Sequence, residues 1–214
     1  MGVAGLLASL DGPSTEVAQV VALLGAAGFD EPNRLSVGEG DRRLLSLYRS
    51  VTGEELELLA ACPACGELSV ARIDPEEVPP PGPRMAVLGR GGGLREPTYG
   101  DLLDLPADPA LATAELCERC VVGSPARPPE ANDLELVDDS LAGPVMIACS
   151  ACGQPVAVNL DVEQAVVERL VRRAREIDRQ IHALASAYHW SLDEIESLGD
   201  ERRQTLAELI AEAS

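Results

Sequence analysis

Two short cysteine motifs that lie far apart in the chain carry its most specific chemical pattern. They are Cys62-Pro63-Ala64-Cys65-Gly66 and Cys149-Ser150-Ala151-Cys152-Gly153, and both have the form C-x-A-C-G. Two residues between cysteines allow both thiolates to face one metal ion, and the glycine permits the positive φ of a tight turn. Two such pairs supply the ligands of a closed tetrahedral site. We therefore predict a structural zinc ion bound by Cys62, Cys65, Cys149 and Cys152.

Other interpretations of the six cysteines stay open at this point. The four sulfurs can be free buried thiols, or they can hold iron, which would make the chain a redox protein. A third pair, Cys117 and Cys120, falls in a predicted helix and has no glycine after it. Because it also lacks a strand-turn context, we expect this pair to pack in the core rather than bind metal. Thioredoxin-like redox chemistry at this pair would require a βαβ setting, which is missing here.

The composition argues against several classes of function. The 214 residues include 36 acidic residues and 17 basic ones, all arginine, for a net charge of −19. Such a charge disfavours general nucleic-acid binding, which needs a basic face. No GxGxxG, P-loop, HExxH or GxSxG motif is present, and neither histidine, His182 or His189, has ligand spacing to a cysteine pair. We expect a protein that is not an enzyme and has no small-molecule substrate.

The sequence also bears on location. No apolar run approaches the roughly 20 residues that a membrane-spanning helix needs. The first residues, MGVAGLLASLDG, lack the positively charged start of a signal peptide. Cysteines in a chain without an export signal indicate reduced thiols, so we expect a cytoplasmic protein without a membrane partner.

We expect an α+β fold in three parts. Residues 1–61 form a helical segment, residues 62–160 form a split zinc ribbon, and residues 161–214 form a helical region. The ribbon strands are predicted at 68–73, 145–148 and 155–160, where apolar and polar or small residues alternate or β-branched residues gather. A Pro/Gly-rich loop and a helical insertion, about residues 74–144, separate the two halves of the ribbon.

Capping signals and periodicity predict the helices. Ser14 or Thr15 begins the first helix, and Ser36 with Glu39 forms a capping box for the second, which ends at Gly53. Further helices are predicted at 54–61, 99–105 and 109–122, and a short one after the capping box of Ser191 with Glu194. Residues 134–141 are predicted as a weak helix or turn, and a short strand at 85–88 interrupts a long loop, 74–93.

A long helix is predicted after Asp161, which caps it with Gln164. Apolar residues spaced three and four apart form a seam typical of a helix packed along a partner. The seam consists of Val167, Leu170, Ala174, Ile177, Ile181, Leu184 and Tyr188. The opposite face carries arginines that we interpret as a solvated, ion-paired face or as a docking strip. The candidate partner-binding residues are Arg169, Arg172, Arg173, Tyr188 and Trp190.

Taken together, these motifs resemble the baseplate or baseplate-hub assembly proteins of contractile phage tails and related extracellular contractile injection systems. The matching residues include Val37-Gly38-Glu39, Asp41-Arg42, the first cysteine motif, Arg95-x-Pro97-Thr98-x-x-Asp101-Leu102, Arg119-Cys120-Val121, and the run from Cys149 through Tyr188-x-Trp190-x-x-x-Glu194-Ile195-x-x-Leu198. In that family an aliphatic residue usually stands in place of Cys117.

The resemblance implies a structural or assembly protein of the baseplate, present in the cytoplasm during assembly or in the finished particle. Its partners would be other baseplate, hub or spike proteins. The alternative from the residues alone is a nucleic-acid-binding zinc ribbon of the transcription type. That alternative predicts basic and aromatic residues on the ribbon strands, where Arg72 is the single cation.

Overall fold

The computed structural model describes residues 15–82, 84–89 and 91–212. It is an α+β fold, as the sequence predicts, and its chain divides into two compact units, 1–167 and 168–214. The boundary falls inside the long helix. Each unit is therefore described by itself.

The first unit begins with helices whose ends follow the predicted caps. Helix α2 (Glu16–Ala26) starts after Thr15, whose hydroxyl accepts a hydrogen bond from the Ala18 amide. A short 3₁₀ turn η1 (Pro32–Arg34) precedes helix α3 (Val37–Thr52). The Ser36 hydroxyl accepts from the Glu39 amide, and Gly53 ends the helix at φ +74°. Ser14, the other candidate cap, lies outside the described residues.

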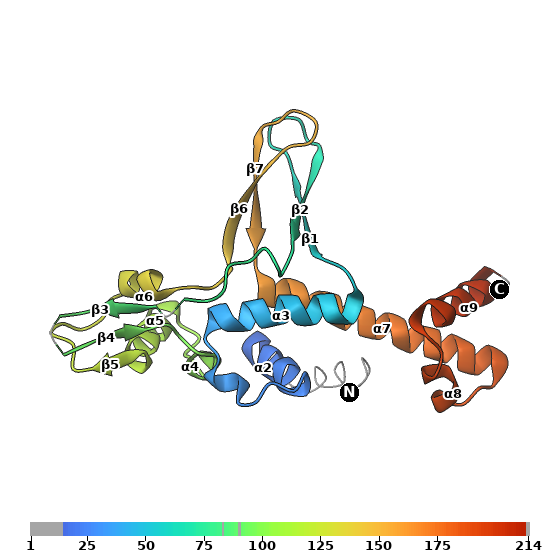
Figure 1. The fold of residues 1–214 in the computed structure, drawn as a ribbon, viewed down its shortest axis with the longest axis horizontal. Helices are drawn as coiled ribbons and strands as arrows, with labels where there is room; N and C mark the ends of the chain where they lie inside the picture. The colour runs from blue at the N-terminus through green and yellow to red at the C-terminus, as the bar shows by residue number, and fades with distance from the viewer. Residues whose placement is uncertain (1–14, 83, 90, 213–214) are drawn as a thin grey trace. The chain divides into compact units, whose positions relative to one another are not determined.

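Two antiparallel hairpins form the ribbon (Figure 1). Strand β1 (Leu56–Ala61) pairs with β2 (Leu68–Ile73), and β6 (Gly143–Ala148) pairs with β7 (Pro155–Leu160). The hairpins lie side by side, with β1 next to β7 and β2 next to β6. Their facing surfaces are closed by small and β-branched side chains, including the buried Ala71, Val156 and Val158. The ribbon is therefore assembled from segments far apart in the chain.

The helix predicted at 54–61 is wrong, because strand β1 occupies residues 56–61. Glu, Leu and Ala favour a helix locally. In the structure every β1 residue is paired with a residue of β2, from Leu56 opposite Ile73 to Ala61 opposite Leu68. Leu56 is buried while Glu57 is exposed and binds Arg72 across the hairpin at 2.8 Å. Cross-strand packing outweighs the local helix preference here.

The insertion contains a three-stranded sheet as well as the predicted helices. Strands β3 (Met85–Val87), β4 (Gly92–Arg95) and β5 (Val121–Gly123) are joined in that order. Helices α4 (Tyr99–Leu102), α5 (Pro109–Arg119) and α6 (Ala131–Val137) accompany the sheet. Their shared core contains the buried Leu88, Leu94, Cys120 and Val137.

The strands β4 and β5 were not predicted. The sequence pattern predicts a loop at Gly91–Gly93 and a helix end at Val121–Val122. In the structure the main chain passes very close at these glycines. A Cβ on Gly123 would lie 2.3 Å from the Gly91 carbonyl oxygen, and one on Gly92 would lie 2.6 Å from the Val122 carbonyl oxygen. Glycine is required by this close approach.

Helix α3 anchors the insertion through its first turns. The Gly38 amide donates to Glu96 Oε1 at 3.0 Å, and the Leu141 amide donates to Asp41 Oδ2 at 2.8 Å. Arg42 donates to the Asp139 carbonyl oxygen at 3.0 Å and lies 3.4 Å from the Asp139 carboxylate. The motif Val37-Gly38-Glu39-x-Asp41-Arg42 is thus a structural junction between distant parts of the chain.

Asp41 should make the stability of the first unit depend on pH. The pKa of its carboxyl is raised from 3.8 to about 7, mainly by burial and also by the nearby Glu163 and Asp161, while the Leu141 amide and Arg42 act in the opposite direction. The folded chain therefore keeps a proton that the unfolded chain loses above pH 4, so stability falls as pH rises toward 7.

The test compares wild-type protein with Asp41→Asn by urea unfolding at pH 6 and pH 8. A single group with a folded pKa near 7 stabilises the wild type by about 1.4 kcal/mol more at pH 6 than at pH 8. Asparagine can still accept from Leu141 but does not titrate, so the variant should lose this difference. Burial also raises the pKa of Glu163 to about 6, and Glu163→Gln serves as the second variant. An unchanged pH difference in both variants would contradict this assignment.

The second unit contains most of α7 (Val162–Tyr188), followed by α8 (Leu192–Glu196) and α9 (Asp200–Glu212). The predicted caps are confirmed: Asp161 Oδ1 accepts from the Gln164 amide, and Ser191 and Glu194 form a capping box. Leu184, Ile195 and Leu206 form the core of this unit. Of the predicted seam residues, Leu170, Ile177 and Leu184 are buried, whereas Tyr188 is exposed. Within the described residues, no helix is both long enough and apolar enough to cross a membrane.

Candidate metal centre

The two cysteine motifs form the same turn twice, one at the tip of each hairpin. The Gly66 amide donates to the Cys62 carbonyl oxygen, and the Gly153 amide donates to the Cys149 carbonyl oxygen, at 2.8 and 2.9 Å. Gly66 and Gly153 have φ of +77° and +71°, a conformation that L side chains rarely adopt. A Cβ would meet no atom within 4 Å at either position. These glycines are therefore needed for backbone conformation and not for space.

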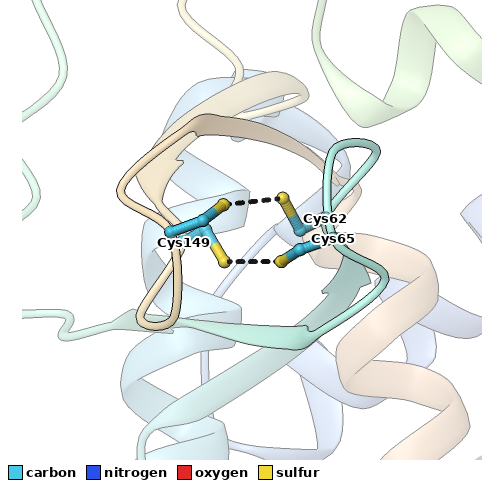
Figure 2. Close-up of side chains that lie close together, drawn as sticks. Cys62, Cys65 and Cys149 are labelled. Atoms are coloured by element: carbon cyan, nitrogen blue, oxygen red, sulfur yellow. Dashed lines mark hydrogen bonds between the residues drawn. The ribbon is translucent and has the colours of Figure 1, made fainter.

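The four sulfur atoms converge between the two hairpin tips (Figure 2). Cys62 Sγ lies 3.7 Å from Cys152 Sγ, and Cys65 Sγ lies 3.7 Å from Cys149 Sγ. All four sulfurs lie within 4.8 Å of one another. Each short distance joins one hairpin to the other, so the cluster ties the two halves of the split ribbon together.

The spacing of the sulfurs fits a tetrahedral metal ion. Zinc–thiolate bonds of about 2.3 Å place ligand sulfurs about 3.8 Å apart at the tetrahedral angle. The two sulfur–sulfur distances of 3.7 Å lie close to this value, and no pair exceeds it by more than about 1 Å, which side-chain rotation can absorb. The cysteines are free thiols, not disulfides. The four cysteines can therefore hold one metal ion, as the sequence analysis proposes.

The surroundings favour a thiolate at Cys149, whereas the neighbouring thiols raise the pKa of Cys65 and Cys152. The amides of Cys152 and Ala151 donate to Cys149, and these hydrogen bonds lower the pKa of the Cys149 thiol to about 6. Cys62 and Cys149 are buried with Val156, whereas Cys65 and Cys152 are exposed. The site thus has an apolar inner side and an outer side that solvent reaches, which gives an ion or a chelator access.

The pair Cys117 and Cys120 lies apart from this cluster. Both side chains are buried, and Cys120 belongs to the core of the insertion with Leu94 and Val137. Burial raises the pKa of both thiols, that of Cys120 to about 11, which keeps them protonated. Within the described residues, the only metal-compatible group of cysteines, histidines or carboxylates is the cluster at the ribbon tips. This agrees with the predicted packing role of the pair.

The candidate partner-binding residues all lie in the second unit, where their environments differ. The Tyr188 and Trp190 rings stack with centroids 4.8 Å apart, and Trp190 packs against the Leu184–Ile195–Leu206 core. Arg173 lies 3.4 Å from Asp200 and 3.9 Å from Glu176. Arg169 is half-buried and not free, whereas Arg172 is exposed. Trp190 and Arg173 therefore help to hold the second unit together, whereas Arg172 is available to a partner.

The outer faces of the ribbon expose apolar side chains rather than the basic residues that a nucleic-acid-binding site needs. Leu59 and Val70 are directly opposed on one hairpin, and both are exposed, as are Leu68 and Met146. Arg72, the single cation on the ribbon strands, is already bound to Glu57. These surfaces do not favour contacts with phosphates.

The chain was compared with known protein families, with curated proteins and with solved structures, and no match was found in any of them.

Proposed function

We propose that the chain is a non-enzymatic structural or assembly component of the baseplate of a contractile tail or injection system. In this proposal a zinc ion bound by Cys62, Cys65, Cys149 and Cys152 stabilises the ribbon. The helices dock on other baseplate, hub or spike subunits, in the cytoplasm during assembly or within the particle. The observation that carries the structural part is the closed cluster of four sulfurs joining two hairpins from distant parts of the chain.

Zinc is the ion that this donor set favours. Four thiolates at tetrahedral spacing fill every coordination position, so no position remains for a substrate or a reactive water. The metal's contribution is then to folding, because its ligands are brought together only when both hairpins are formed. Iron in the same cage differs in its spectrum, and absorption in the visible range would separate the two metals.

The baseplate assignment is supported by the positions of the residues that carry the resemblance. Gly38, Asp41 and Arg42 join helix α3 to the insertion. Arg95 binds the Asp101 carboxylate through two nitrogens, at 2.6 and 3.0 Å, and Asp101 also caps the turn at Thr98. The residues of these two motifs therefore hold parts of the fold together. Proteins that share a fold are expected to keep such residues in the same order.

Deletion of the gene in a host that produces contractile tail-like particles tests this function. We expect sheath and tube fragments without complete baseplates in electron micrographs of the deletion strain. A plasmid copy should restore intact particles, and a Cys62→Ser/Cys149→Ser copy should not, whereas Cys117→Ala should behave as wild type. Intact particles from the deletion strain would contradict the proposed function.

A further inference from the structure

The arginines of the second unit divide into those that have acidic partners and those that do not. Arg173 and Arg203 both bind Asp200. Among the residues that the structure describes, four arginines have no ion pair or hydrogen bond to a neighbouring group. These are Arg172, Arg175, Arg179 and Arg202, and all four are exposed. The other described arginines bind carboxylates, except Arg169, which is not free either.

Unpaired arginines are unexpected in a chain with 36 acidic and 17 basic residues, because carboxylates are in twofold excess. The carboxylates nearest to Arg172, Arg175 and Arg179 in sequence interact with other groups or lie on another face of the helix. Glu176, four residues after Arg172, lies 3.9 Å from Arg173, and Glu168, four residues before it, is not free. Asp178 is exposed and directly precedes Arg179 in sequence, but adjacent residues of a helix do not share a face. The local sequence thus leaves three positive charges of α7 without compensation.

Three of the four unpaired arginines lie on one face of α7. Residues 172, 175 and 179 are spaced three and four apart, so their side chains form one row along the helix. At 1.5 Å per residue, the row is about 10 Å long. The buried Leu170, Ile177 and Leu184 lie on another face of the same helix. The row therefore faces away from the core of its unit.

We infer that the row formed by Arg172, Arg175 and Arg179 is a docking face for an acidic α-helix of a partner protein. A helix with Asp or Glu spaced three and four apart presents carboxylates at the same intervals. Guanidinium groups bind carboxylates through two parallel hydrogen bonds, so the pairing selects register as well as charge. A polyanion such as DNA fits the row poorly, because its phosphates extend far beyond a row of this length. This inference goes beyond the proposed function and does not depend on it.

The test measures binding of two labelled helical peptides to the purified 214-residue chain by fluorescence anisotropy. One peptide carries three glutamates in a row at spacings of three and four. The second has the same composition with the glutamates distributed around the helix. At about 0.1 M salt, where exposed charges still interact over ~10 Å, the row peptide should bind about tenfold more tightly than the shuffled one.

The matched variants change charge equally. Arg172→Gln/Arg175→Gln/Arg179→Gln should remove the preference for the row peptide. Arg34→Gln/Arg72→Gln/Arg202→Gln, which removes the same number of positive charges from other exposed positions, should keep it. Equal binding of the two peptides, or loss of preference in both variants, would overturn the inference. Competition by a short DNA duplex as effective as the row peptide would overturn it too, because it would indicate a phosphate site.

Discussion

Cys62→Ala and Cys149→Ala are each expected to abolish stoichiometric metal binding and to unfold the ribbon. Each cysteine would contribute one of the four ligands, and each cysteine pair belongs to only one of the two hairpins. Isolated two-stranded hairpins are at best marginally stable in water, so we expect a bound metal to supply much of the stability of the two hairpins. Structural zinc contributes apparent binding free energies on the order of 10 kcal/mol. We expect either variant to lose several kcal/mol, measured by urea unfolding followed with circular dichroism.

Cys117→Ala is the matched control for these variants. Cys117 is as buried as Cys62 and Cys149, but it packs in the insertion and belongs to no metal-compatible group. Its replacement should cost only about 1 kcal/mol and leave the metal content unchanged. A chelator should reproduce the effect of Cys62→Ala in the wild type and in Cys117→Ala. If Cys117→Ala destabilised the chain as much as Cys62→Ala, the structural role assigned to the four-sulfur cluster would be wrong.

Gly40→Ala should be strongly destabilising although it replaces glycine by alanine inside helix α3. Alanine normally stabilises a helix relative to glycine by about 1 kcal/mol. At this position a Cβ would lie 2.1 Å from Tyr99 Cε2 and 2.3 Å from the Tyr99 hydroxyl oxygen. The Tyr99 ring is completely buried and cannot move aside without displacing its neighbours. We expect a loss of about 3 kcal/mol, measured by urea unfolding.

Gly25→Ala provides the comparison for Gly40→Ala. Gly25 is also helical, and a Cβ there would meet only Pro32 Cγ, at an ordinary contact distance of 3.7 Å. This variant should be neutral or stabilised by up to about 1 kcal/mol. The two substitutions make the same chemical change, so their opposite signs would isolate the contact with Tyr99. Equal effects would show that the α3–α4 junction is looser than described.

The four-cysteine cluster was predictable from sequence because the signals that form each half of it are local. Both C-x-A-C-G motifs specify their own turn, and the glycines after Cys65 and Cys152 adopt the expected positive φ. Helix ends were predictable for the same reason, since Ser36, Asp161 and Ser191 act on amides within three residues of themselves. Signals of this kind need no knowledge of the rest of the fold.

Features that depend on distant residues were missed. Strand β1 forms because β2 offers a partner for each of its residues, and nothing within 56–61 indicates this. Strand β4 forms at glycines, which a local pattern assigns to loops, because β3 and β5 approach its main chain on both sides. Tertiary structure also decides which arginines of α7 lack acidic partners. Arg173, for example, is bound by Asp200 from another helix of the second unit. The candidate docking residues therefore shift from Arg169 and Arg173 toward Arg175 and Arg179.

X-ray absorption at the zinc edge, with the metal content measured on the same purified sample, tests the central claim most directly. The four-sulfur site predicts one zinc ion per chain with four sulfur neighbours at about 2.3 Å. The Cys117→Ala variant should give the same spectrum. A purified, folded chain without bound metal, or a zinc shell containing nitrogen or oxygen in place of any of the four sulfurs, would contradict the account.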